Sequence, residues 1–117
     1  MAWTPIGGWS SWVPDRYVRL LHRFLETHAA DPRHLEEELA LDRRDDAARR
    51  LHRMKGAAAT LGLQAIASEA ADLEALLRQS PDGPADAHAL HERTDHLAAL
   101  LLALGQVVSG PGSSQGT

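Results

Sequence analysis

The residue types best able to do chemistry lie in one short stretch, from His52 to Gly62. Lys55 and Gly56 follow His52 at helical spacing, within an apolar pattern typical of a continuous amphipathic helix. At about 100° per residue, His52 points about 140° away from the apolar stripe. A glycine inside a helix costs about 1 kcal/mol relative to alanine. This costly glycine beside an outward-facing histidine indicates that something approaches the imidazole closely.

The surface around His52 is predicted to lack long side chains. Ala48, Gly56 and Ala59 lie near it on the same helix face, where a solvated helix of this Arg- and Glu-rich chain would normally carry long charged side chains. By position alone, we expect Ala48, Arg49 and Ala59 to form a docking surface for a partner.

Phosphoryl transfer is the chemistry that these residue types favour. Histidine is largely neutral near pH 7, and neutral imidazole is a nucleophile toward an activated phosphoryl group. Lys55, the only lysine in the chain, stands one turn away and could pair with the resulting phosphate. Such transfer usually needs Mg²⁺, but no convergent carboxylates stand beside His52 in the sequence. The metal and most of the catalysis are therefore expected from the partner.

At these residues the sequence resembles the histidine-containing phosphotransfer (HPt) domain family. The family motif is His-x-Leu-Lys-Gly, followed by small residues and a further glycine. His52, Lys55, Gly56 and Gly62 match it, and Met54 replaces the usual leucine, which conserves volume. The resemblance covers roughly residues 15–104 and extends to the small-residue and Leu-Glu pattern formed by Ala67, Ala71, Leu73 and Glu74.

The resemblance implies a carrier rather than an enzyme. His52 would accept a phosphoryl group from the aspartate of a receiver domain and hand it to another receiver, Lys55 would support the phosphate, and Gly56 would leave room for the partner. It implies no nucleotide site and no cofactor bound by this chain, with Mg²⁺ held by the receiver. The domain could be free-standing or belong to a hybrid sensor kinase.

Apolar periodicity predicts an all-α fold: an antiparallel up-down four-helix bundle with an additional N-terminal helix. The leading helix should start at Pro14 and end near His28–Ala30. A short helix should follow, with Asp31 as its N-cap and Pro32 at its first position. Three further helices are expected to end near Leu61, before Pro81 and at Gly105. The inner face of the helix that carries His52 should consist of Ala47, Leu51, Met54, Ala58 and Leu61.

The predicted bundle spans residues 14–105 and lies between two segments of different composition. Residues 1–13 contain all three tryptophans, Trp3, Trp9 and Trp12, and form either a linker or a leader whose indoles pack on one end of the bundle. Residues 106–117 are expected to be a flexible tail. We expect the domain to be monomeric.

Composition excludes several function classes. A net charge of −4 argues against nucleic acid or an anionic membrane as the main partner. There is no cysteine, and therefore neither disulfide nor thiolate chemistry. The N-terminus lacks the features of a secretory signal, and no apolar run approaches the roughly 20 residues of a membrane span. A cytoplasmic domain, alone or as the soluble part of a membrane-bound sensor kinase, is therefore expected.

Two alternatives from other classes remain open at this point. The bundle could bind a receiver or kinase domain without being phosphorylated, although Lys55 speaks against this. It could instead bind a metal through His88, His91, Asp95 and His96 of the last helix. That second alternative lacks an evident ligand from another helix.

Overall fold

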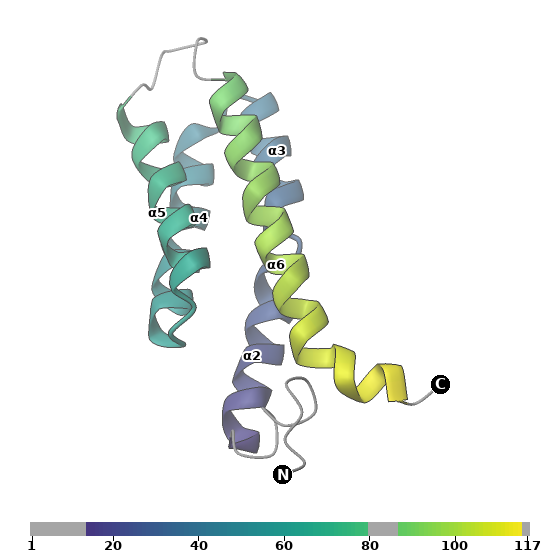
Figure 1. The fold of residues 1–117 in the computed structure, drawn as a ribbon. Coiled ribbons are helices and arrows are strands. Elements are labelled where there is room, and N and C mark those ends of the chain that lie inside the picture. The colour runs from purple at the N-terminus through teal and green to yellow at the C-terminus, as the bar shows by residue number, and fades with distance from the viewer. Residues whose placement is uncertain (1–13, 80–86, 116–117) are drawn as a thin grey trace.

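The computed structural model of the chain describes residues 14–79 and 87–115, and this part is helical without strands. Figure 1 shows its helices, which are α2 (Asp15–His28), α3 (Asp31–Ala40), α4 (Arg44–Thr60), α5 (Gln64–Gln79) and α6 (Ala87–Gln115). The predicted packing of the N-terminal tryptophans lies outside the described residues. No described helix is both long and apolar enough to cross a membrane.

The leading helix is nearly continuous with the next one. Ala29 and Ala30 both keep right-handed helical backbone angles between α2 and α3. Figure 1 shows α2 and α3 following one another alongside α6. If α2 and α3 are counted as one element, the described residues form four helices.

The prediction that Asp31 caps α3 is wrong, because Ala30 occupies the cap position and Asp31 is the first helical residue. The Asp31 carboxylate is buried and engaged elsewhere. It lies 2.7 Å from Nδ1 of His28 and accepts a hydrogen bond of 3.0 Å from Arg50 on α4. Arg50 also donates to Glu38, so that this guanidinium fastens α4 to α3.

Four of the helices form a closed ring of contacts: α3 contacts α4, α4 contacts α5, α5 contacts α6, and α6 contacts α3. A tight turn joins α4 to α5, and Gly62 adopts a φ of 78° there. The N–H of Leu63 donates to the carbonyl of Ala58, and that of Gly62 to Ala59. This is the Schellman pattern, which favours glycine at the left-handed position.

The predicted inner face of α4 is confirmed at four positions: Ala47, Leu51, Met54 and Ala58 are each 0% exposed. The prediction that Ala48 forms part of a docking surface is wrong, because Ala48 is only 4% exposed and belongs to the core. It lies about two turns before Lys55 on the same side of α4, the side that faces α5. A small side chain there lets α5 approach, so Ala48 cannot be part of an exposed docking surface.

The prediction that the last helix ends at Gly105 is also wrong, because α6 continues to Gln115. Val108 is buried beyond the glycine, so apolar packing continues past it. A helical glycine costs about 1 kcal/mol but does not forbid the helix.

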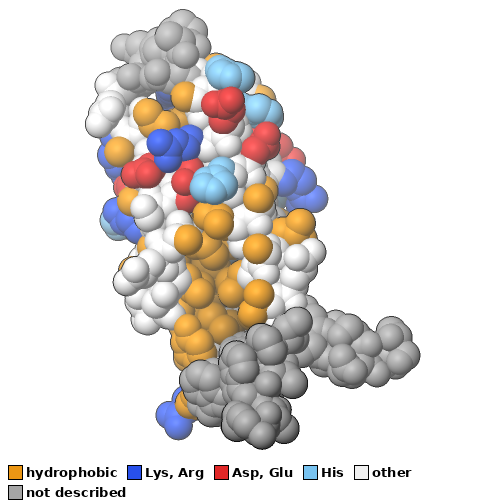
Figure 2. Space-filling model, in the orientation of Figure 1, with side chains coloured by type: hydrophobic (Ala, Val, Ile, Leu, Met, Phe, Trp, Pro, Cys, Tyr) orange, Lys and Arg blue, Asp and Glu red, His pale blue; other side chains and the backbone are white. Residues whose placement is uncertain are grey.

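Figure 2 shows the surface of the molecule in the orientation of Figure 1. Charged and histidine side chains lie over the upper half of the face in view, and hydrophobic side chains lie over the lower half.

Replacement of Gly62 by alanine should lower the free energy of unfolding by about 1 kcal/mol, because a Cβ is disfavoured at positive φ. The added Cβ would meet no atom within 4 Å, so the cost is conformational. The matched control is Gly105→Ala, at a helical position that is equally open, and it should raise stability by about 0.5–1 kcal/mol. Urea unfolding followed by circular dichroism measures both changes. Equal effects of the two variants would contradict the assignment of the turn.

Candidate functional site

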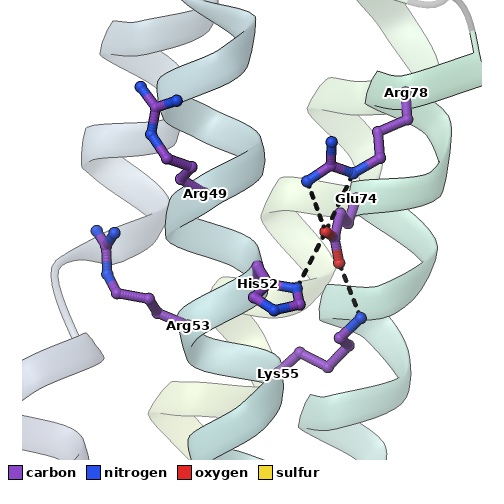
Figure 3. Close-up of a pocket in the computed structure, with 6 residues that line it drawn as sticks. All are labelled: Arg49, His52, Arg53, Lys55, Glu74 and Arg78. Atoms are coloured by element: carbon purple, nitrogen blue, oxygen red, sulfur yellow. Dashed lines mark hydrogen bonds and ion pairs between the residues drawn. The ribbon is translucent and has the colours of Figure 1, made fainter.

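His52 projects from α4 into solvent, with 66% of its side chain exposed. One ring nitrogen has a protein neighbour: Nδ1 lies 3.3 Å from Oε2 of Glu74 on α5 (Figure 3). A carboxylate beside Nδ1 favours the tautomer whose proton is on that atom. The lone pair is then on Nε2, the ring nitrogen that is not engaged by Glu74.

Glu74 is the buried centre of this site. Its side chain is 8% exposed, yet it lies 3.0 Å from Nζ of Lys55 and accepts hydrogen bonds from Nε and Nη2 of Arg78. Burial raises the pKa of Glu74, but the hydrogen bonds from Lys55 and Arg78 outweigh it, so the pKa lies below its usual range. Because a buried charge is costly unless it is paired, this carboxylate fixes the positions of its partners on both helices.

A shallow hollow surrounds the imidazole, and its lining is strongly basic. Arg49 is exposed, as predicted, and pairs with Asp46. Within the described residues, Arg53 has no ion-pair partner. An arrangement with four cations and one carboxylate suits an anionic group or an acidic partner surface. The lining residues are Arg49, His52, Arg53, Lys55, Glu74 and Arg78.

Gly56 and Ala59 are exposed on the same helix, as predicted. A Cβ built on Gly56 would meet no atom within 4 Å. The fold therefore has space for a larger residue at this position, and the packing of the chain does not demand the glycine. The site thus combines an exposed imidazole, a basic hollow and a helix surface with small side chains.

Sequence reasoning missed the roles of three lining residues: Glu74, Arg78 and Arg53. Glu74 and Arg78 stand at the i, i+4 spacing of a helical ion pair, which is a visible signal. That signal does not show that the pair faces His52, because this depends on how α5 is placed against α4. Arg53 adjoins His52 in the chain, but neighbouring residues on a helix do not face each other.

Comparison with known proteins gives one finding. A family model described as Hpt domain matches residues 19–107, a range that includes every residue lining the hollow. No curated protein and no solved structure matches the chain significantly.

The pairing of Glu74 predicts a specific loss of stability in acid. A carboxyl group whose folded-state pKa is depressed stabilises the fold above its unfolded pKa of about 4.5, and this contribution disappears as the pH falls through the folded-state pKa. Glu74→Gln should therefore lower the free energy of unfolding by about 1–2 kcal/mol at pH 7. It should also weaken the decline of stability between pH 7 and pH 3, as measured by urea unfolding.

The control for this test is Glu92→Gln, which removes an exposed carboxylate paired with His88. Exposed pairs contribute little, so this variant should follow the wild-type acid profile. A Glu74→Gln profile parallel to that of the wild type would show that Glu74 is not the paired group that the site requires.

Proposed function

The chain belongs to the Hpt domain family, and on this premise we propose that His52 is the phosphoryl carrier of a two-component phosphorelay. It accepts the group from the phospho-aspartate of one receiver domain and passes it to another receiver. The observation that carries the proposal is the pairing of an exposed imidazole with a buried carboxylate that also holds Lys55. Hpt domains act as carriers, so the chain serves as a substrate of its partners rather than as an enzyme.

In the proposed transfer, the lone pair of Nε2 attacks phosphorus in line with the aspartyl oxygen. The N–P bond forms as the O–P bond breaks, and the aspartate leaves as a carboxylate. Nδ1 keeps its proton, and the positive charge that develops on the ring is stabilised by Glu74, 3.3 Å away. Glu74 is thus a positioning residue that acts through His52.

The basic lining of the hollow supports the docking step. Receiver active sites are acidic and hold the Mg²⁺ that phosphoryl transfer needs, so opposite charge on this chain would speed encounter. Arg49 and Arg53 lie on the side of His52 opposite to Glu74 and would contact the receiver (Figure 3). Lys55 would pair with the phosphoryl group after transfer, as a cation one helical turn away can.

The wider assignments rest on the family and the helix packing. We infer that the four-sided packing is an up-down bundle and that the domain works as a monomer in the cytoplasm, where receiver domains are found. It would act either as a separate carrier or within a hybrid sensor kinase. Ala59 and Gly56 would lie under the docked receiver.

Incubation with a phosphorylated receiver domain and Mg²⁺ should move phosphate onto the wild-type chain. The adduct should be acid-labile and alkali-stable, as expected for phosphohistidine. His52→Gln should accept none, because the amide is not a nucleophile. His88→Gln removes a histidine that is 82% exposed and lies outside the hollow, and it should accept phosphate normally. Receiver binding without transfer would favour the non-phosphorylated interaction module instead.

Gly56→Gln separates stability from docking. Gln is a better helix former than Gly, and the position is open, so stability should rise by about 0.5 kcal/mol. Transfer from the receiver should nevertheless slow about tenfold, because that factor corresponds to only about 1.4 kcal/mol of lost docking energy. The matched control, Gly105→Gln, lies at an equally open helical position of α6 and should transfer at the wild-type rate. Normal rates in both variants would contradict the close-approach argument.

A further inference from the structure

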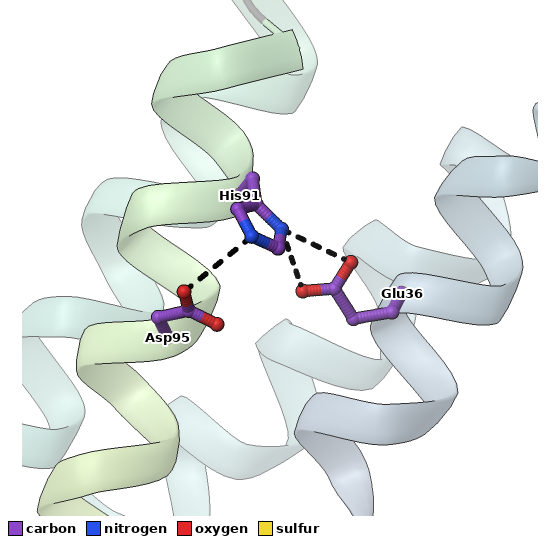
Figure 4. Close-up of side chains that lie close together, drawn as sticks. All are labelled: Glu36, His91 and Asp95. Carbon is purple, nitrogen blue, oxygen red and sulfur yellow. Dashed lines mark hydrogen bonds and ion pairs between the residues drawn. The ribbon is translucent and has the colours of Figure 1, made fainter.

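Three side chains that the proposed phosphorelay does not use meet on the surface between α3 and α6. Nδ1 of His91 lies 3.0 Å from Oε2 of Glu36, and Nε2 of His91 lies 3.5 Å from Oδ2 of Asp95 (Figure 4). His91 and Asp95 occupy one face of α6, and Glu36 comes from α3. The structure therefore places a carboxylate from a second helix beside His91, which the sequence did not reveal.

The other histidines of α6 do not take part. His88 pairs with Glu92 on its own helix, at 3.2 Å. His96 pairs with Glu69 of α5, at 3.0 Å. The four-residue site considered from sequence is thus divided, and the candidate is reduced to the Glu36–His91–Asp95 cluster.

We propose that the Glu36–His91–Asp95 cluster binds a divalent transition-metal ion of the zinc type. One ligand atom from each residue lies within 4.8 Å of the others. Zinc takes imidazole nitrogen and carboxylate oxygen at about 2.0–2.2 Å, so modest rotations of these partly or fully exposed side chains bring the three atoms to one ion. The imidazole favours zinc over Mg²⁺ or Ca²⁺, which prefer all-oxygen sites.

The ion would take one ring nitrogen of His91. Glu36 lies at Nδ1 and Asp95 at Nε2, so one of the two carboxylates would rotate to reach the same ion. Two carboxylates and a neutral imidazole supply a charge of −2 to balance a divalent cation, and water would fill the fourth position. Because metal ligands must be deprotonated, metal binding at this cluster should weaken in acid.

The bound ion would join two helices that are far apart in the chain. The cluster lies between α3 and α6, whereas His52 lies on α4 toward α5. Because a ligand that binds only the folded state stabilises it, zinc should raise the thermal stability of the bundle. It should do so without changing the phosphoryl-transfer site.

Thermal unfolding of the full chain with increasing ZnCl₂ at pH 7.5, together with isothermal titration calorimetry, tests the proposal. We expect a rise in Tm that saturates at one ion per chain and is absent with MgCl₂. Both Glu36→Gln and His91→Ala should lose the response. His88→Ala, which removes an exposed histidine that has an i, i+4 carboxylate but no partner on α3, should keep it.

Several outcomes would overturn this inference. They are the absence of a Tm rise, a rise that persists in His91→Ala, and a rise that persists in Glu36→Gln and so indicates an α6 site without α3. The His52→Gln variant should respond to zinc like the wild type. Failure of phosphoryl transfer and failure of metal binding are therefore distinguishable.

Discussion

The arrangement of the site depends on the ion pairs of the buried Glu74 carboxylate. An unpaired charge at this depth would cost several kcal/mol, so the fold must bring cations to it. Lys55 reaches it from α4 and Arg78 from its own helix, and the His52 ring lies against the same oxygen that Arg78 engages. One buried carboxylate thus links α4 to α5 and lies against the imidazole.

Helix positions could be predicted largely from the sequence, because apolar spacing reports burial directly. Leu51, Met54 and Ala58 follow the 3.6-residue period and are fully buried. The failures occur where a neighbouring helix decides the outcome. Ala48 is buried because α5 covers its side of α4, and α6 passes Gly105 because apolar packing continues to Val108. Neither contact can be predicted from the local sequence alone.

The same distinction holds for the site. That His52, Lys55 and Gly56 lie close together could be predicted from sequence, because they share one helix, whose geometry is known in advance. Glu74 acts across a helix interface, and Glu36 meets His91 across another. Such pairs depend on the rotation and height of one helix against the next. The sequence alone therefore indicated His52, whereas its contact with Glu74 could be found only in the tertiary structure.

The tight turn at Gly62 has a consequence for how the site forms. It joins the two helices that supply every residue lining the hollow, so the site belongs to a single helical hairpin. Contacts between consecutive helices close short loops, and such local contacts favour rapid folding. All the ion pairs of Glu74 lie within this hairpin, so none of them requires a side chain of α2 or α6. The residues that line the hollow therefore come from two helices that are consecutive in the chain.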